Sequence, residues 1–293
     1  MWTADEIPDL TGSVAVVTGA SGGIGVPTAL ELARHGARVV LTARDADRGR
    51  AALDAIRTAV PGAAAEVRAL DLADLASVRA FAETVDGPLD LLVNNAGLGP
   101  SPRRTTADGF EAQFGVNHLG HFALTGLLMP HLLAAPAARV VTVSSDAHSV
   151  GDLDFDDLGL ERRYNRFAAY ARSKLANLLF ALELRRRADA CGAPLLSLAT
   201  NPGMTATGIM KMGALTRPVN ALLRLAVQPP AKGALPSLYA ATFPGARSGE
   251  YVGPGPKVLP PSPKALDAAV AARLWERSQE LTGVPFDEIR QYS

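Results

Sequence analysis

A tyrosine and a lysine four residues apart, Tyr170 and Lys174 in the stretch YARSK, could carry proton-transfer chemistry. On a helix this spacing places both side chains on one face. A phenol with a pKa of about 10 is a poor proton shuttle at neutral pH. A neighbouring ammonium group favours the phenolate and so lowers that pKa. The pair therefore predicts a general acid and base, although the pattern alone is common and needs support from its surroundings.

Three glycines, Gly19, Gly23 and Gly25, follow an apolar run in the stretch VTGASGGIG. Between a strand and a helix, such glycines permit a tight turn, close approach of a diphosphate and packing of the helix on the strand. The N-terminus of the helix then presents free N–H groups and its positive dipole end to phosphate. The spacing G-x-x-x-G-x-G differs from the general dinucleotide fingerprint, so a purely structural turn stays open on this motif alone.

Short apolar runs alternate with amphipathic segments up to about residue 200. The β-branched apolar runs predict buried strands, and the segments between them predict helices. Strands are expected at 13–19, 37–44, 64–72, 89–97, 138–145 and 194–203. Helices are expected at 25–36, 45–62, 74–87, 108–134 and 168–190. Regular alternation with short connections predicts an α/β fold, a parallel sheet with helices on both faces.

The last third of the chain is less regular but shows no linker, low-complexity tract or repeat, so we expect one domain over residues 1–293. Within it, the sequence indicates a cofactor and catalytic core over 11–203, a substrate lid over 204–230 and a C-terminal extension over 231–293. The lid carries several leucines and methionines, which suit an adaptable hydrophobic pocket. Core packing or a subunit contact explains any one of them equally well. The extension is expected to hold helices at 231–243 and 265–283 and a loop or short edge strand at 249–263.

The composition excludes several classes of partner. Over 293 residues, 29 Lys+Arg balance 29 Asp+Glu, and a net charge of zero argues against a nucleic-acid or membrane-surface partner. The lone Cys191 excludes an intramolecular disulfide and indicates a reducing compartment. His118 and His121 have no acidic third ligand nearby in the sequence, so no metal site is expected. The N-terminus is too polar for a signal peptide, and no apolar stretch is long enough to span a bilayer. We therefore expect a cytoplasmic protein without a membrane anchor.

Five motifs occur in a fixed order on the expected elements: TGASGGIG at 18–25, LDL at 70–72, NNAG at 94–97, YARSK at 170–174 and NPGMTAT at 201–207. In this order the chain resembles the short-chain dehydrogenase/reductase family over most of its length. The resemblance implies a single Rossmann-type, doubly wound parallel sheet of about seven strands, and hydride transfer with a nicotinamide cofactor. It implies cofactor contacts from Gly19, Ser21, Gly23, Ile24, Gly25, Asp71, Leu72, Asn95, Ala96, Gly97, Tyr170, Lys174, Pro202, Gly203, Thr205 and Thr207.

The same resemblance implies four catalytic residues. Tyr170 would be the general acid in carbonyl reduction and the base in alcohol oxidation, and Lys174 would hold the nicotinamide ribose hydroxyls. Ser145 would hydrogen-bond the substrate oxygen, with Ser144 as the alternative. Asn117 matches the family asparagine whose main-chain carbonyl holds a water joining Lys174 to solvent; a helix-kink or packing residue is the structural alternative.

The end of the second expected strand, VVLTARD, bears on the choice of cofactor. An NAD enzyme of the doubly wound type usually has an acidic residue there, bonded to the ribose hydroxyls, whereas a 2′-phosphate requires an arginine. Ala43 occupies that position and Arg44 follows it, so NADP(H) is preferred over NAD(H). Arg48 or Arg68 could assist, and an ordinary surface arginine is the alternative for Arg44. Asp45 is explained as a helix N-cap.

A gap of 25 positions separates Ser145 from Tyr170, about twice that of many family members. This longer segment resembles the branch of retinol-dehydrogenase-like and WW-domain-oxidoreductase-like proteins, which act on lipophilic aldehydes, alcohols and ketones. Residues 146–169 are interpreted either as one wall of the substrate cleft or as a solvated hairpin. Asn201 departs from the branch, because many relatives have a histidine before the Pro-Gly pair.

The combined prediction is an NADP(H)-dependent enzyme that interconverts a carbonyl and an alcohol on a lipophilic small molecule. One alternative is a cofactor-binding sensor or scaffold without turnover, and another is a reductase of carbon–carbon double bonds. The two long helices that carry the catalytic motifs commonly form dimer interfaces in relatives, so a homodimer or homotetramer is possible by analogy.

Overall fold

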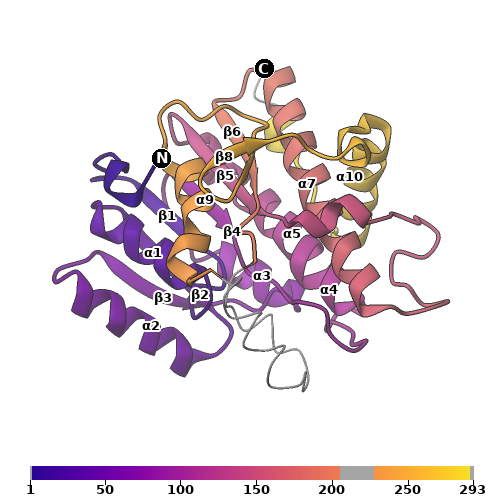
Figure 1. Ribbon diagram of the computed structural model, residues 1–293, viewed down its shortest axis with the longest axis horizontal. Helices are drawn as coiled ribbons and strands as arrows, with labels where there is room; N and C mark the ends of the chain where they lie inside the picture. The colour runs from indigo at the N-terminus through magenta and orange to yellow at the C-terminus, as the bar shows by residue number, and fades with distance from the viewer. Residues whose placement is uncertain (1, 205–227, 291–293) are drawn as a thin grey trace.

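The computed structural model describes residues 2–204 and 228–290. Its centre is a sheet with the strand order β3-β2-β1-β4-β5-β6-β7-β8 (Figure 1). Neighbouring strands are parallel except for the last pair, β7 and β8. The strands are β1 (Val14–Val17), β2 (Arg38–Ala43), β3 (Ala65–Ala69), β4 (Leu91–Asn94), β5 (Ala138–Val143), β6 (Leu195–Thr200), β7 (Tyr251–Gly253) and β8 (Lys257–Leu259).

Helices cover both faces of this sheet, as the alternating pattern predicts (Figure 1). The α-helices are α1 (Gly25–Arg34), α2 (Ala46–Ala59), α3 (Leu75–Ala82), α4 (Ala112–Phe114), α5 (Gly120–Leu127), α6 (Met129–Leu133), α7 (Arg166–Cys191), α9 (Pro230–Thr242), α10 (Ala268–Thr282) and α11 (Asp287–Arg290). A π-helical turn, η2 (Gly115–Leu119), joins α4 to α5. Short 3-10 turns are η1 (Ala4–Glu6), η3 (Asp146–Val150) and η5 (Pro263–Leu266).

The predicted doubly wound α/β fold is confirmed, with eight described strands where about seven were expected. The extra strand comes from the segment 249–263, which forms the β7–β8 hairpin and not a loop or single edge strand. The described part of the C-terminal extension is therefore integral to the sheet. The chain reverses its winding direction at β1, whose neighbours are β2 and β4, and open α/β sheets bind ligands at such switch points.

The core lies on the two faces of the sheet, because successive strand residues point to opposite sides. Val16 and Val140 belong to one apolar cluster, with side chains of α3, α5 and α7. Val17 and Val141, one residue further along the same strands, belong to the other cluster, with side chains of α1, α2 and α9. This double burial explains why the central strands are continuous apolar runs and not alternating ones.

The single long helix expected over 108–134 is wrong. The segment divides into α4, the π-helical turn, α5 and α6. In the π-helical turn the Gly120 N–H bonds to the Gly115 carbonyl, five residues back. The break after α5 falls at Leu128, with φ −89° and ψ 0°, two residues before Pro130, which cannot donate a helical hydrogen bond. Apolar periodicity continues through both irregularities; Pro130 marks the second break in the sequence, whereas no residue type marks the π-helical turn.

An aromatic cluster attaches the C-terminal helices to this region. The rings of Phe122, Phe180, Trp275 and Phe286 pack with centroid distances of 4.4–5.7 Å. All four side chains are at most 3% exposed, and they come from α5, α7, α10 and the segment before α11. The cluster therefore holds α10 and the segment before α11 against α5 and α7.

Replacing Phe122 by alanine tests this attachment. Phe122→Ala is expected to lower the free energy of unfolding by about 3–5 kcal/mol, because it removes a fully buried ring and leaves a cavity. Phe167→Ala is the matched control, since Phe167 is 53% exposed, and it should stay within about 1 kcal/mol of the parent. Urea denaturation of both variants measures the difference, and equal losses would contradict the assignment of Phe122 to the core.

Candidate active site

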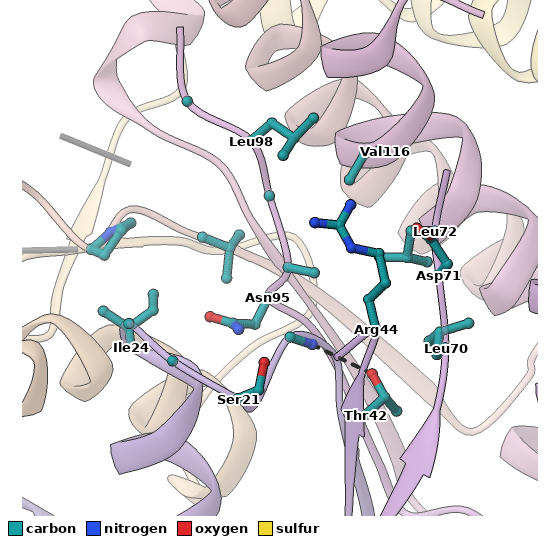
Figure 2. Close-up of a pocket in the computed structure, with 18 of the residues that line it drawn as sticks. Ser21, Ile24, Thr42, Arg44, Leu70, Asp71, Leu72, Asn95, Leu98 and Val116 are labelled. Atoms are coloured by element: carbon teal, nitrogen blue, oxygen red, sulfur yellow. Dashed lines mark hydrogen bonds between the residues drawn. The ribbon is translucent and has the colours of Figure 1, made fainter. Parts of the chain in front are cut away.

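A cavity of about 560 Å³ lies at the carboxyl ends of the strands, beside the switch point at β1 (Figure 2). It brings together thirteen of the residues predicted to hold the cofactor: Gly19, Ser21, Gly23, Ile24, Arg44, Asp71, Leu72, Asn95, Ala96, Gly97, Tyr170, Lys174 and Pro202. The sequence did not assign a cavity role to Gly22, Thr42, Leu70, Leu98, Gly99, Val116 and Val143, which also line it. These are mostly apolar neighbours of the motifs, and the sequence carries no separate signal for them.

The turn after β1 packs directly on the stretch after β4. Gly19 has φ +64°, and a Cβ there would lie 2.9 Å from the Ala96 Cα. A Cβ on Gly25 would lie 2.6 Å from Asn95 Nδ2 and 2.7 Å from the Gly19 carbonyl oxygen. These positions require glycine, so the motif has a structural reason in addition to its expected contact with a ligand. Gly25 itself begins α1 and is not among the residues that line the cavity.

Thr18 and Asn95 fix these two segments to each other. The Asn95 side-chain amide donates to the Thr18 carbonyl oxygen at 2.6 Å. The Thr18 hydroxyl oxygen accepts from the main-chain N–H groups of Asn95 at 2.8 Å and Ala96 at 2.9 Å. Thr18 is fully buried, and no role for it was predicted, although it opens the glycine motif. Its contribution depends on partners 77 and 78 positions away, which the sequence alone does not bring together.

Two arginines lie at the end of the cavity formed by β2 and α2. Figure 2 shows Arg44 reaching into the cavity alongside Asp71 and Leu72. Arg48 lies in the first turn of α2, and its guanidinium is 3.4 Å from the Ser21 carbonyl oxygen. Arg68 does not line the cavity, because its guanidinium bonds to Glu66 and to the Thr84 hydroxyl. Of the two assisting arginines considered, the structure brings only Arg48 to the site.

Asp45 is the N-cap of α2. Its carboxylate oxygen accepts from the main-chain N–H groups of Asp47 and Arg48, each at 3.0 Å. The N-cap predicted at Asp45 is therefore confirmed, and its carboxylate is hydrogen-bonded to the N-terminus of α2.

Tyr170 and Lys174 lie on α7 at the opposite end of the cavity. Lys174 is 3% exposed, and its ammonium donates to the Val143 carbonyl oxygen at 3.0 Å. Burial lowers the pKa of Lys174 from its ordinary value to about 8. The Lys174 Nζ lies 5.8 Å from the centre of the Tyr170 ring. At pH 7 the lysine is therefore mainly charged and stands close to the phenol.

The pKa of Tyr170 differs from the expectation. A lysine neighbour was expected to lower it, but burial raises the pKa of Tyr170 above its ordinary value, and a hydrogen bond with Ser145 opposes this rise. Desolvation disfavours the phenolate. The raised pKa keeps the proton on Tyr170 and makes the phenol a weaker acid, so its transfer requires a charge that favours the phenolate, such as the Lys174 ammonium.

The two serines at the end of β5 have different surroundings. The Ser144 hydroxyl donates to the Lys174 carbonyl oxygen at 2.7 Å and is 1% exposed. Ser145 is half-buried; its hydroxyl lowers the pKa of the Tyr170 phenol, and its oxygen accepts from the Ala147 N–H at 3.3 Å. Ser144 therefore supports α7, while Ser145 stands beside the phenol, although only Ser144 lines the cavity.

Asn117 lies in the π-helical turn and is completely buried. Its side-chain oxygen accepts from the Leu98 N–H at 2.7 Å, and its amide donates to the Leu98 carbonyl at 3.0 Å and to the Ser173 hydroxyl at 2.9 Å. It thereby joins the stretch after β4 to α7. Asn117 is not among the residues that line the cavity, and the water expected at its main-chain carbonyl stays a prediction.

The Pro-Gly segment after β6 is held by Asn201. Its side-chain amide donates to the Asp146 carboxylate at 2.6 Å, and its carbonyl oxygen accepts from the Gly203 N–H at 2.9 Å. Gly203 has φ +68° and does not line the cavity, whereas Pro202 does. The predicted contacts of Thr205 and Thr207 lie outside the described residues, as does most of the expected lid over 204–230.

Residues 146–169 are anchored to the rest of the domain and are not a free hairpin. The Tyr164 hydroxyl donates to the Ser101 carbonyl oxygen at 2.9 Å and accepts from the Gln113 amide at 2.9 Å. The Arg172 guanidinium, on α7, bonds to the main-chain carbonyls of Asp152 and Asp157. No residue of this segment lines the described cavity, so its place in a substrate cleft stays a prediction.

The comparisons with known proteins place these observations in a family. A family model described as short chain dehydrogenase matches residues 13–216. Human retinol dehydrogenase 13 is 42% identical over 294 residues, covering 96% of this chain and 88% of that protein. Mouse polyprenol dehydrogenase is 43% identical over 292 residues, covering 94% of this chain and 86% of that protein. The chain belongs to the short-chain dehydrogenase family, in its retinol-dehydrogenase-like branch.

Solved structures agree with this assignment. An uncharacterised protein from Mycobacterium paratuberculosis has a TM-score of 0.81 and 43% identity, covering 97% of this chain and 98% of that one. A protein from Beutenbergia cavernae, provisionally described as an NAD(P)-dependent gluconate 5-dehydrogenase, was solved with NADP bound at low occupancy. It has a TM-score of 0.67 and 26% identity, covering 84% of this chain and 96% of that one. The chain is thus an oxidoreductase of a family that uses a nicotinamide dinucleotide.

The cavity fits such a dinucleotide. The glycine turn brings bare backbone to the cavity wall, and α1 starts immediately after it. The N-cap of α1 is Ile24, whose side chain cannot accept a hydrogen bond, so the first N–H groups of the helix are left for a ligand. The N-terminus of α1 and the Arg44 guanidinium are the groups at this cavity that could hold the negative charge of a dinucleotide.

The described residues contain neither a cluster that could bind a metal ion nor a membrane-spanning helix. Within residues 2–204 and 228–290, no three His, Cys, Asp or Glu side chains lie where they could share a metal ion. No helix in the same part of the chain combines the length and the apolar composition needed to cross a bilayer.

A matched pair of glycine variants tests the packing of the turn. Gly25→Ala forces a Cβ against the Asn95 amide and the Gly19 backbone, so we expect the free energy of unfolding to fall by about 1–3 kcal/mol. In Gly22→Ala the new Cβ meets only the Arg48 guanidinium, at 2.7 Å, which is the end of a flexible side chain. That variant should stay within about 0.5 kcal/mol of the parent in urea denaturation without cofactor. Equal losses in the two variants would refute the packing argument.

Proposed function

We propose that the protein is an NADP(H)-dependent oxidoreductase that interconverts a carbonyl and an alcohol on a lipophilic small molecule. The observation that carries this proposal is the meeting of Tyr170, Lys174 and Ser145 at the end of β5, next to the cavity of the glycine turn. A protonated phenol, a buried ammonium and a hydroxyl at one end of a dinucleotide cavity are the groups that carbonyl reduction requires.

Each residue has a distinct task in this mechanism. In the reductive direction Tyr170 donates its proton to the substrate oxygen, and Ser145 donates a hydrogen bond that orients the same oxygen. The Lys174 ammonium stabilises the phenolate that forms, which offsets the desolvation that raises the pKa of Tyr170. In the oxidative direction the phenolate takes the proton from the alcohol.

When bound, the nicotinamide supplies or accepts the hydride. Lys174 would hold the hydroxyls of the nicotinamide ribose, while Asn95, Ala96 and Gly97 form the adjoining wall of the cavity. Asn117 keeps that wall in place through its bonds to Leu98. Residues of the protein thus hold the cofactor and the substrate, and Tyr170 transfers the proton.

The preference for NADP(H) rests on charge at the adenosine end. Arg44 and Arg48 both line the cavity there, and Ala43 stands where an acidic residue would bind ribose hydroxyls. The acid directly after Arg44, Asp45, already caps α2 through two main-chain N–H groups. Guanidinium groups bind phosphate strongly, so a 2′-phosphate would gain more here than a bare hydroxyl.

The substrate class follows from the relatives. The names retinol dehydrogenase and polyprenol dehydrogenase denote long apolar alcohols, and these proteins are 40–43% identical to this chain. This similarity favours a lipophilic alcohol or aldehyde. A sensor without turnover would not require the complete set of Asn117, Ser145, Tyr170 and Lys174. A reductase of carbon–carbon double bonds stays the enzymatic alternative.

Three further expectations stay predictions. The division into a core over 11–203, a lid over 204–230 and an extension over 231–293 is one of them. A cytoplasmic location, argued from the lone cysteine and the balanced charge, is another. Assembly into a homodimer or homotetramer is the third.

Removing one hydroxyl tests the role of Tyr170. Tyr170→Phe is expected to lower the rate of NADPH consumption with lipophilic aldehydes by at least about a hundredfold, because proton donation is lost. NADPH binding should persist, since the ring stays in place. Tyr239→Phe, which removes a hydroxyl on α9 outside the cavity, is the matched control. Full turnover by the Tyr170 variant would remove it from the mechanism.

The cofactor preference is tested at Arg44. We expect Arg44→Ala to reduce the ratio of kcat/KM for NADPH over NADH by about tenfold to a hundredfold, the worth of a charge-assisted hydrogen bond. Arg50→Ala is the control, because Arg50 lies on α2, which begins two residues after Arg44, but pairs with Asp47 and is not at the cavity. A variant that loses activity equally with both cofactors would show that Arg44 does not select the phosphate.

A further inference from the structure

A buried histidine forms hydrogen bonds to Thr18, at the start of the glycine turn, and to Asn117, in the π-helical turn. His121, in α5, is 1% exposed and has a hydrogen-bond partner at each ring nitrogen. Its Nδ1 lies 3.0 Å from the Asn117 main-chain carbonyl oxygen, and its Nε2 lies 2.9 Å from the Thr18 hydroxyl oxygen. Most buried histidines bond to whatever core groups are nearby, but both partners of this one belong to the site.

The partners determine which nitrogen carries the proton. A carbonyl oxygen only accepts, so the hydrogen is on Nδ1 and Nε2 is an acceptor. The Thr18 hydroxyl must then donate to Nε2. This is consistent with its other contacts, because its two lone pairs accept the N–H groups of Asn95 and Ala96. The Val93 carbonyl is a more distant alternative acceptor for the same hydroxyl, at 3.2 Å.

The surroundings keep the ring neutral. Burial is the main cause that lowers the pKa of His121 to about 4, and the Lys174 charge on α7 adds to it. The other ionisable neighbour is His118, three residues earlier in the helix, whose pKa burial and then His121 lower to about 3. A second proton on His121 would point from Nε2 at a hydroxyl oxygen whose lone pairs are already used.

We infer that His121 is a positioning residue of the active site. Its two hydrogen bonds fix the distance and orientation between the Asn117 main chain and the Thr18 hydroxyl. An effect of His121 on catalysis presupposes the proposed function. Asn117 in turn bonds to Ser173, the neighbour of Lys174 in α7, and to Leu98 at the cavity wall. A Cβ on Gly97 would lie 3.3 Å from Asn117 Oδ1 and 3.6 Å from Lys174 Nζ, so both side chains approach Gly97 at this wall.

His121 therefore completes a hydrogen-bonded path from the end of β1 to Ser173, the residue before the catalytic lysine. The path runs from Thr18 through His121 and Asn117 to Ser173. Displacing a catalytic group by about 1 Å can reduce the rate a hundredfold. A residue that fixes Asn117 thus acts on the rate of reaction through Lys174, and touches neither substrate nor cofactor.

Two substitutions test the hydrogen bonds of Nδ1 and Nε2 separately. An asparagine amide can occupy the position of Nδ1 and keep a donor toward Asn117, whereas a glutamine side chain can reach Thr18 in place of Nε2. We expect His121→Gln to lower kcat by about tenfold or more and to shift the pH at half-maximal kcat, while the KM for NADPH changes by less than about threefold. His121→Asn should keep a higher kcat than His121→Gln, together with the parent's pH profile.

His118 provides the matched control. It is as deeply buried on the same stretch of chain, but its Nε2 lies 2.9 Å from the Ser278 hydroxyl of α10, away from the cavity. His118→Gln should lower the thermal stability and leave the pH profile of kcat in place. If the His118 variant shifts the profile as much as the His121 variants, His121 has only a structural role and the inference is overturned.

A measurement without turnover tests the same inference. In ¹⁵N-histidine-labelled protein, with His121→Asn used to assign the signal, two-bond ¹H–¹⁵N spectra should show His121 neutral, with the proton on Nδ1, from pH 5 to pH 8. A proton on Nε2, or titration near pH 6.5, would overturn the inference whether or not the protein is active. If the spectra agree but the parent reduces no carbonyl, the proposed function fails and the hydrogen-bonding assignment stands.

Discussion

The contact between the turn after β1 and the stretch after β4 is the constraint on which the rest of the site depends. Side-chain carbon at Gly19 or Gly25 would overlap Ala96 or Asn95, so the two segments touch through bare backbone. Thr18 and Asn95 close the contact with three short hydrogen bonds. Because β1 and β4 are neighbours where the winding reverses, this contact also forms the floor of the cavity.

A buried polar network extends from this floor to the catalytic end. Asn117, His121, Ser144 and Ser173 are all at most 1% exposed, and each bonds to a group of another segment. Buried polar groups are costly without partners and rigid when fully paired. At the catalytic end, burial lowers the pKa of Lys174 to about 8, and its ammonium donates to the Val143 carbonyl oxygen.

The fold could be predicted from the sequence because it depends on local patterns. The five strand–helix repeats, the cap at Asp45 and the glycine turn are each readable within a few residues. The breaks in the expected long helix are not, because apolar periodicity runs through the π-helical turn. The β7–β8 hairpin is too short and too rich in proline and glycine to give a clear strand signal.

The site could be predicted where a motif carries it and not where partners are distant in the sequence. Tyr170, Lys174 and Arg44 all reach the cavity as expected. Thr18 and His121 meet across 103 positions, and no local pattern shows that contact. The pKa of Tyr170 is the clearest difference: the spacing to Lys174 suggested a lower value, but burial, which spacing does not reveal, raises it.

The central claim is that the protein interconverts a carbonyl and an alcohol. Its most direct test is to identify the substrate atom that receives the hydride. The protein would be incubated with NADPH in which both hydrogens on C4 of the nicotinamide are replaced by deuterium and with an α,β-unsaturated lipophilic aldehyde, and the product would be analysed by mass spectrometry and NMR. We predict one deuterium on the carbinol carbon of an unsaturated alcohol. Deuterium on a carbon of the former double bond, or NADPH bound without any labelled product, would contradict the proposed carbonyl–alcohol chemistry.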